Sequence, residues 1–188
     1  MDNPSAKLPI GVFDSGIGGI SVLAEIIKLL PNEEFIYFAD TLHAPYGDKP
    51  EDVVRAFSIK AAEFLSSIGI KCLVVACNTA TGAAINEIRK MCTFPVVGME
   101  PAVKPAAELG IKGKILVMAT PLTLKSKKFN ELMRHYKHHS EIVPLPCPGL
   151  VEIIEQGHTH GREIEEYLSH LFSSVNKEDI SSIVLGCT

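Results

Sequence analysis

The stretch Val74-Val75-Ala76-Cys77-Asn78-Thr79-Ala80 (VVACNTA) joins an apolar run to a cysteine and two small hydrogen-bonding residues. Such a run is typical of a buried strand, and the pattern that follows from Thr79 predicts a helix. The last residues, Ile183 to Thr188 (IVLGCT), repeat the same order of apolar run, small residue, Cys and Thr. Cys77 and Cys187 are therefore both expected at the end of a strand.

The rest of the chain repeats this alternation of strand and helix. Strands are predicted at 8–13, 35–39, 72–76, 95–98, 114–119, 141–145 and 182–185. Helices are predicted at 19–30, 50–67, 79–91, 101–109, 121–136, 149–156 and 161–175. Strands that alternate with helices favour an α/β fold with mainly parallel sheets.

Polar residues follow several of the predicted strands. In α/β sheets, ligands bind beyond the carboxyl ends of the strands, so these residues are expected to converge on one edge. They are Asp14-Ser15 with the glycines to Gly19, Pro45-Tyr46-Gly47, Cys77-Asn78-Thr79, Thr120, and Cys187-Thr188.

Composition narrows the class of protein. The chain has 188 residues, 46% of them hydrophobic and 21% charged, as in a globular protein with a sizeable core. Its net charge of −4 and its scattered basic residues do not indicate a basic surface for binding nucleic acid. The apolar runs are too short to span a membrane, and Met1 to Lys7 lack the apolar core of a signal peptide. We therefore expect a cytoplasmic protein.

The other cysteines and most histidines are expected to be structural or solvated. Five cysteines form no paired metal-binding spacing, and an odd count argues against a disulfide framework. Cys72 and Cys92 are expected to be small buried hydrophobes, and Cys147 is left open between a structural and a functional role. Five histidines fall at polar helix ends and in a loop, where solvent exposure is expected, and no metal is predicted: His135, His138, His139, His158 and His160.

The glycine-rich loop from Asp14 to Gly19 (DSGIGG) allows two interpretations. Backbone N–H groups at a helix start can hold an anion, or the glycines can serve only a tight turn. The loop matches neither G-x-G-x-x-G nor a Walker motif. Asp14 would repel a phosphate and suits an ammonium group.

Two thiols that face each other are suited to moving a proton from one side of a carbon atom to the other. A free thiol has a pKa of about 8.5, so each must be tuned by its neighbours to act as a base near neutrality. Asn78, Thr79 and Thr188 offer dipoles and helix-start N–H groups that favour a thiolate. A nucleophilic cysteine would need a nearby His as base, and His43, the nearest, is expected to be solvent-exposed.

Four motifs together resemble the glutamate racemase family, and the resemblance covers the entire chain. They are Asp14 to Gly19, Ala39-Asp40-Thr41 with Pro45-Tyr46-Gly47, Ala76 to Ala80, and Leu185 to Thr188. The resemblance implies interconversion of L- and D-glutamate without a cofactor, supplying D-glutamate for bacterial peptidoglycan. It also implies two similar α/β domains, 1–98 and 99–188, with the active site in the cleft between them.

The resemblance also implies roles for individual residues. Cys77 and Cys187 would be the two acid/base groups, and a carboxylate that assists one Cys corresponds better to Glu155 than to Glu152. The implied partner is a small molecule, glutamate, with neither nucleic acid nor a membrane; a homodimer is allowed. The residues expected to contact the substrate are Asp14, Ser15, Tyr46, Gly47, Asn78, Thr79 and Thr188.

One departure and two alternatives remain. In the family a His directly follows the Gly-Cys-Thr motif and further chain completes the first domain, whereas this sequence stops at Thr188. We expect the segment that follows in the family to be required for solubility and activity. One alternative is a racemase for aspartate or another amino acid, since one methylene group is worth only about 1–3 kcal/mol of discrimination between substrates. The other alternative is a non-catalytic module that binds a carboxylate.

Overall fold

The computed structural model describes residues 7–138 and 140–188, which form two compact units. The first unit comprises Met1–Glu100 together with Cys187–Thr188, and the second comprises Pro101–Gly186. The sequence had suggested a boundary between residues 98 and 99 and had placed the last two residues in the second domain. In the structure these two residues group with the first unit.

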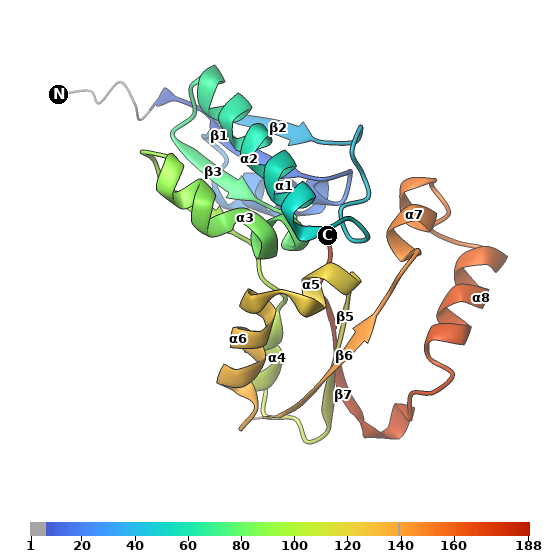
Figure 1. The fold of residues 1–188 in the computed structure, drawn as a ribbon. Helices are drawn as coiled ribbons and strands as arrows, with labels where there is room; N and C mark the ends of the chain where they lie inside the picture. The colour runs from blue at the N-terminus through green and yellow to red at the C-terminus, as the bar shows by residue number, and fades with distance from the viewer. Residues whose placement is uncertain (1–6, 139) are drawn as a thin grey trace. The chain divides into compact units, whose positions relative to one another are not determined.

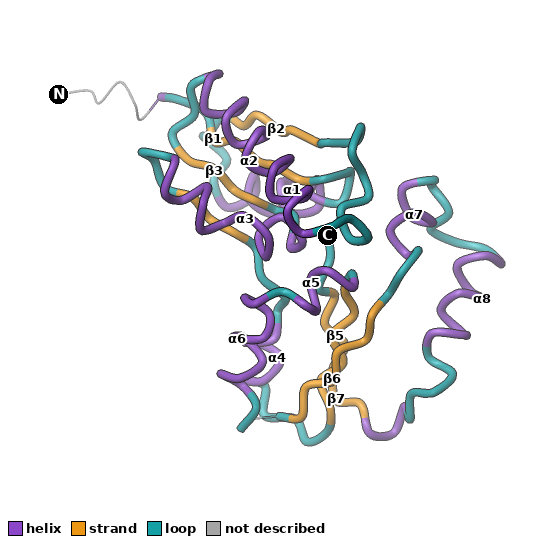
Figure 2. Tube along the Cα trace, viewed as in Figure 1, coloured by secondary structure: helices purple, strands orange, loops and turns teal. Residues whose placement is uncertain are grey.

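The first unit contains a parallel sheet of four strands in the order β2-β1-β3-β4. The strands are β1 (Ile10–Asp14), β2 (Phe35–Ala39), β3 (Cys72–Val75) and β4 (Val96–Gly98). The helices are α1 (Gly19–Leu29), α2 (Glu51–Ile68) and α3 (Asn78–Met91). Each helix connects two of these parallel strands in the alternation that the sequence predicts (Figures 1 and 2).

Helices cover both faces of the first sheet. One face carries Ile10, Val12 and Val74, which form a cluster with side chains of α1. Figure 1 shows α2 and α3 together on the opposite side, where a Cβ on Gly11 would lie 2.9 Å from Cδ1 of Ile70. Because both faces are covered, β1 is buried along its whole length, which explains its continuous apolar sequence.

The second unit contains a parallel sheet of three strands in the order β6-β5-β7. The strands are β5 (Lys114–Ala119), β6 (Glu141–Pro146) and β7 (Ile180–Leu185). The helices are α4 (Val103–Glu108), α5 (Pro121–Lys125), α6 (Lys127–Tyr136), α7 (Leu150–Glu155) and α8 (Arg162–Leu171), with a 3₁₀ turn at Lys177–Asp179. Its core joins α4 and α6 to the sheet through Val103, Ile115, Val117, Phe129 and Val184. The prediction of an α/β fold with parallel sheets is confirmed.

The prediction of one continuous helix over 121–136 is wrong. Ser126 has φ −62° and ψ 147°, an extended conformation that separates α5 from α6. Its hydroxyl oxygen accepts a hydrogen bond from the N–H of Phe129 at 3.1 Å, so Ser126 caps α6. A serine that caps a new helix offers the backbone an alternative to continuing the previous one, and the apolar periodicity does not reveal this competition.

The remaining boundaries either coincide with the predicted ones, as in β2 and β5, or differ by at most four residues, with the largest difference at the end of α8. Within the described part of the chain, none of the helices combines the length and the apolar character that crossing a bilayer would need.

We predict that Ser126→Ala lowers the free energy of unfolding by about 0.5–2 kcal/mol, because the first turn of α6 loses its cap. Urea denaturation followed by circular dichroism measures the change. Ser66→Ala, at an exposed position of α2, is the matched control and should leave stability within about 0.5 kcal/mol of the original protein. Equal effects of the two substitutions would contradict the capping role.

Candidate active site

The carboxyl ends of three neighbouring strands bring the predicted site residues of the first unit together. Asp14 ends β1, Asp40 follows β2, and Cys77 follows β3. The register pairs Asp14 with Ala39 and Phe13 with Val75, so the strands end at nearly the same level. Parallel pairing therefore places side chains from distant parts of the sequence at one edge of the sheet, as predicted.

The Cys77 thiol is a buried, hydrogen-bonded group. Cys77 is 2% exposed and caps the N-terminus of α3. Its Sγ accepts a hydrogen bond from the N–H of Ala80 at 3.4 Å. The hydroxyl of Ser15 lies 3.3 Å from the same sulfur. The thiol is thus fixed by one contact from the loop after β1 and one from its own helix.

The pKa of Cys77 differs from the sequence-based expectation. Burial raises the pKa of this thiol to about 11, with a further rise from the negative charge of Asp14. The hydrogen bonds from Ser15 and Ala80 lower the pKa by less than these effects raise it. The hydrogen bonds thus favour a thiolate, as expected of a helix start, but desolvation of the charged sulfur and the charge of Asp14 outweigh them, so the pKa is not tuned toward neutrality in this state of the protein.

Asp14 connects the glycine-rich loop to the end of the chain. Its side chain accepts hydrogen bonds from the N–H of Gly16 and from the hydroxyl of Thr188, each at 2.8 Å. The residue is 2% exposed. The carboxylate thus holds the substrate-binding candidate Thr188 beside the loop, and Thr188 directly follows the second candidate acid/base, the half-buried Cys187.

Close packing explains two of the loop's glycines. A Cβ on Gly18 would lie 2.2 Å from the carbonyl carbon of Thr188, and one on Gly19 would lie 2.5 Å from the Cβ of Asp14. Neither distance is possible for a real side chain without displacement of the backbone or of Asp14. Of the two interpretations of this loop, the structure favours glycines that permit close approach.

Tyr46 and Gly47 are buried in the loop between β2 and α2. The phenol of Tyr46 donates a hydrogen bond to Oδ2 of Asp40 at 2.6 Å, and its ring packs near Phe13 and Phe57. Burial is the main cause that raises the pKa of this phenol, and the hydrogen bond to Asp40 raises it further. Because the Tyr46 hydroxyl already donates to Asp40, a ligand at this loop would bind to its main-chain groups.

Asn78 and Thr79 begin α3 directly after Cys77, and both side chains are buried. Oδ1 of Asn78 has no hydrogen-bond partner among the described residues. A buried polar atom without a partner costs about 1–3 kcal/mol, which a ligand that donates a hydrogen bond would offset. The oxygen therefore suits an N–H donor such as an ammonium group.

The second unit holds the other predicted carboxylates and one cysteine. Glu152 and Glu155 are half-buried on α7, and the choice of Glu155 as an assisting group stays a prediction. Cys147 is 4% exposed, and its thiol donates to the carbonyl of Leu145 at 3.3 Å. Burial raises the pKa of Cys147, which favours the structural interpretation that the sequence left open. Cys72 and Cys92, expected to be buried, are only half-buried because they lie at the ends of β3 and α3.

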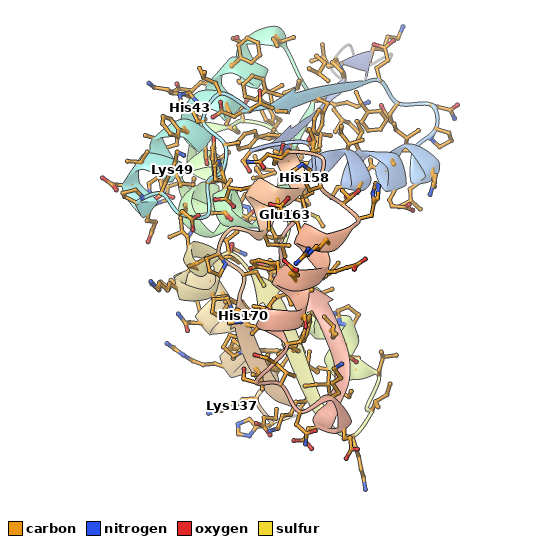
Figure 3. The ribbon with its side chains drawn as sticks, turned by 90° about the vertical axis from the view of Figure 1, so that its right-hand side faces the viewer. His43, Lys49, Lys137, His158, Glu163 and His170 are labelled. Atoms are coloured by element: carbon orange, nitrogen blue, oxygen red, sulfur yellow. The ribbon has the colours of Figure 1, made fainter. Side chains whose placement is uncertain are left out.

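The described histidines of the second unit are exposed. This confirms the predicted solvation of His135, His138, His158 and His160, whereas His139 lies outside the described residues. His158 pairs with Glu163 at 2.5 Å on the surface (Figure 3). Over residues 7–138 and 140–188, the structure groups no three His, Cys, Asp or Glu side chains that could hold a metal ion.

His43 is not the solvent-exposed loop residue that the sequence suggested. Its Nδ1 lies 2.7 Å from Oδ1 of Asp40, and its ring stacks on Phe57 with centroids 3.9 Å apart. The side chain is 38% exposed. Asp40 lies in one of the family motifs, but sequence reasoning gave no role to Asp40 or His43, although their spacing from Tyr46, three residues at each step, was visible.

Comparison with known proteins places this geometry in a family. A family model described as Asp/Glu/Hydantoin racemase matches residues 10–188. A glutamate racemase of Clostridium novyi (strain NT) is 57% identical over 183 residues, which are 97% of this chain and 71% of that protein. The chain belongs to the Asp/Glu/hydantoin racemase family.

Two solved structures of glutamate racemases resemble this family member closely. The Escherichia coli enzyme, in complex with L-glutamate and the activator UDP-MurNAc-Ala, has a TM-score of 0.86 and 34% identity, covering 96% of this chain and 69% of that one. The Francisella tularensis enzyme, in complex with D-glutamate, has a TM-score of 0.83 and 31% identity, covering 96% and 68%. Members of the racemase family thus bind both enantiomers of one small amino acid.

We predict that Asp14→Asn and Ser15→Ala shift the pKa of Cys77 in opposite directions. Loss of the negative charge should lower this pKa, whereas loss of the Ser15 hydroxyl should raise it. The rate of Cys77 alkylation between pH 7 and 11, followed by peptide mass spectrometry, reports the thiolate fraction. Asp14→Asn should therefore react faster than the original protein at pH 9, and Ser15→Ala more slowly.

Alkylation of Cys147 in the same samples is the internal control, since this thiol lies in the second unit. Faster alkylation of Cys77 in both variants would mean that the substitutions only loosen the packing, and would contradict the electrostatic explanation.

Proposed function

We propose that this racemase interconverts L- and D-glutamate by acid/base catalysis with two thiols and without a cofactor, and supplies D-glutamate for bacterial peptidoglycan. The observation that carries the proposal is the buried Cys77 thiol, which feels the charge of Asp14 and directly precedes Asn78, whose side-chain oxygen has no partner among the described residues. The 57% identity to the C. novyi glutamate racemase supports the choice of glutamate.

The two thiols act on opposite faces of the substrate's α-carbon. One sulfur, as thiolate, removes the α-proton, and the other, as thiol, delivers a proton to the opposite face. Each turnover therefore exchanges the protonation states of Cys77 and Cys187 and leaves the substrate inverted. Two groups of the same chemical type suit a reaction whose two directions are mirror images.

Asp14 couples substrate binding to the state of Cys77. Its negative charge raises the pKa of this thiol in the ligand-free protein. An α-ammonium group beside Asp14 offsets that charge, so the bound substrate makes the thiolate easier to form. The high pKa of the resting thiol also protects it, because a neutral buried thiol is a poor nucleophile toward other reagents.

Hydroxyl and amide groups around the thiol hold the amino-acid part of the substrate. Ser15 and Thr79 donate to carboxylate oxygens, since neutral donors bind an anion without adding a competing base. Thr188 contributes its main-chain N–H, because its hydroxyl already donates to Asp14. Asn78 contacts both groups of the substrate: its amide nitrogen donates to a carboxylate and its unpartnered Oδ1 accepts from the ammonium. Tyr46 and Gly47 contribute main-chain N–H groups.

We also propose a cytoplasmic location, since both thiols must remain reduced to exchange protons. A homodimer stays a prediction that analytical ultracentrifugation can test.

We predict that the enzyme in heavy water incorporates one solvent deuterium at the α-carbon for each inversion of L- or D-glutamate. Cys77→Ser and Cys187→Ser should each lower the racemisation rate by about 10²–10⁴-fold, because a hydroxyl is a far weaker base at neutral pH. Circular dichroism of the amino acid and mass spectrometry measure inversion and exchange. Parallel assays with aspartate test the choice of substrate.

Cys92→Ser is the matched control. Cys92 caps the C-terminus of α3, whereas Cys77 caps its N-terminus. It should racemise glutamate at the original rate. Near-normal turnover by Cys77→Ser would contradict the mechanism, and binding of glutamate without exchange of the α-proton would support a non-catalytic module instead.

We predict that Asn78→Ala weakens transition-state binding of glutamate by about 1–3 kcal/mol, measured as the fall in kcat/KM, because a substrate donor and an acceptor lose their buried partner. The free protein should become no less stable, since the lost oxygen had no partner to give up. Unchanged kinetics would mean that Asn78 serves only the start of α3.

A further inference from the structure

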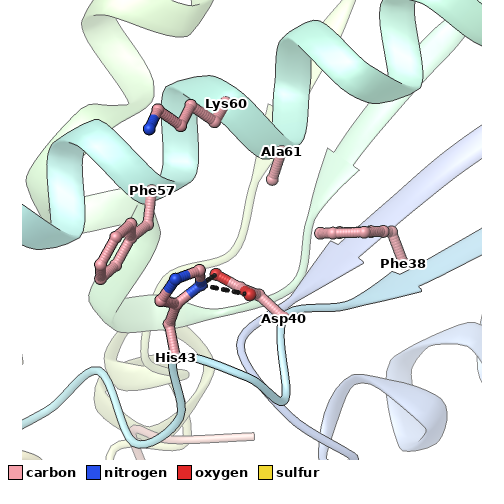
Figure 4. Close-up of a pocket in the computed structure, with 6 residues that line it drawn as sticks. All are labelled: Phe38, Asp40, His43, Phe57, Lys60 and Ala61. Carbon is pink, nitrogen blue, oxygen red and sulfur yellow. Dashed lines mark hydrogen bonds and ion pairs between the residues drawn. The ribbon is translucent and has the colours of Figure 1, made fainter.

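Three side chains that follow β2 form a hydrogen-bonded group. Asp40, His43 and Tyr46 are spaced three residues apart, and the carboxylate of Asp40 lies between the other two. Its Oδ2 accepts from the Tyr46 hydroxyl at 2.6 Å, and His43 Nδ1 lies 2.7 Å from Oδ1 and 3.0 Å from Oδ2. Figure 4 shows Asp40 and His43 facing each other. Both residues line a cavity of about 120 Å³.

Asp40 is fixed by the sheet rather than by the loop. Its N–H donates to the carbonyl of Asp14 at 3.0 Å, which extends the β1–β2 pairing by one residue. The residue is 9% exposed, so its charge is largely removed from water and depends on its two hydrogen-bonding partners. Asp40 therefore links the main chain of Asp14, a proposed substrate-binding residue, through its N–H, to the loop after β2, through its carboxylate.

His43 is held in turn by an aromatic side chain of α2. Its ring stacks on Phe57 with an interplanar angle of 23°. To donate to Asp40, Nδ1 must carry the proton, and the stacked ring keeps that nitrogen aimed at the carboxylate (Figure 4). The loop thus has one anchor in the sheet and another in the helix.

We propose that Asp40 and His43 are positioning residues that hold the Tyr46–Gly47 main chain for the side-chain carboxylate of glutamate. The proposal rests on the proposed function. Cys77, Asn78 and Thr79 follow β3 and hold the α-carbon end, whereas the loop follows β2, on the other side of β1. The far end of the substrate therefore meets the loop, where N–H groups can bind an anion.

This role has a kinetic signature that a direct catalytic role lacks. The side-chain carboxylate keeps its charge while the α-proton moves, so its contacts are equally strong in the ground state and the transition state. Loss of such uniform binding raises KM and leaves kcat unchanged. Loss of an acid/base group lowers kcat instead.

The experiment compares two substitutions of His43. His43→Leu removes the donor and retains much of the volume, whereas His43→Asn places an amide N–H near the position of Nδ1. We expect KM for glutamate to rise about tenfold in His43→Leu, with kcat within about twofold, in both directions of the reaction. His43→Asn should restore most of the loss. Lys60→Met, which changes a side chain lining the same cavity, is the control and should leave KM unchanged.

A second measurement does not depend on activity. Amide hydrogen exchange at Tyr46 and Gly47 should be faster in His43→Leu than in the original protein and in His43→Asn, because the loop has lost one anchor. Asp40→Asn keeps an oxygen for Tyr46 and an amide N–H for His43, and should resemble the original protein more closely than Asp40→Ala does in both measurements.

The outcomes separate this inference from the proposed function. If the original protein fails to racemise glutamate, the proposed function fails, and the exchange rates alone decide whether the anchor exists. If the original protein is active, a fall in kcat at constant KM in His43→Leu overturns the positioning role. Unchanged kinetics and exchange in His43→Leu, or no rescue by His43→Asn, overturn it as well.

Discussion

The residues of the first unit's site are held together by their interactions with Asp14. It accepts hydrogen bonds from Gly16 and Thr188, and its charge acts on the Cys77 thiol, while the carbonyl of the same residue accepts from Asp40. Segments that begin near residues 14, 40, 77 and 187 thus interact with the side chain or the main chain of one residue, Asp14. The glycines at 18 and 19 follow from this arrangement, because a side chain at either position would collide with Thr188 or Asp14.

Burial gives the Cys77 thiol its chemical character. Two hydrogen bonds to sulfur would favour a thiolate at the protein surface, but here desolvation and a neighbouring negative charge dominate. The site therefore holds a protonated sulfur at rest, and a cationic group on the substrate is what would change the balance. In this way the recognition of an amino acid and the activation of the base use the same pair of residues, Asp14 and Cys77.

Secondary structure supports several parts of the site. Cys77 and Asn78 begin a helix whose first turn is buried, and Asp14 ends a strand that is buried on both faces. The one proposed contact on a longer loop, at Tyr46 and Gly47, is tied to Asp40 through a buried phenol. Such supports matter because a displacement of about 1 Å in a bound substrate can change a rate by about 100-fold.

The sequence alone determined the alternation of strands and helices, the parallel sheets and the cysteines at strand ends, because burial on both faces and short polar connections leave a periodic pattern in the chain. The four motifs, two of which surround Cys77 and Cys187, also sufficed to indicate the racemase family. The sequence did not reveal the break at Ser126, where a local cap competes with helix continuation.

Tertiary structure decided everything that depends on distance and on access of water. Only the folded chain places Thr188 against Asp14, 174 residues away, and stacks His43 on Phe57. The direction of the Cys77 pKa shift reversed for the same reason: hydrogen-bonding neighbours can be read along the chain, but the loss of water around a sulfur atom is the sum of all the segments that pack over it.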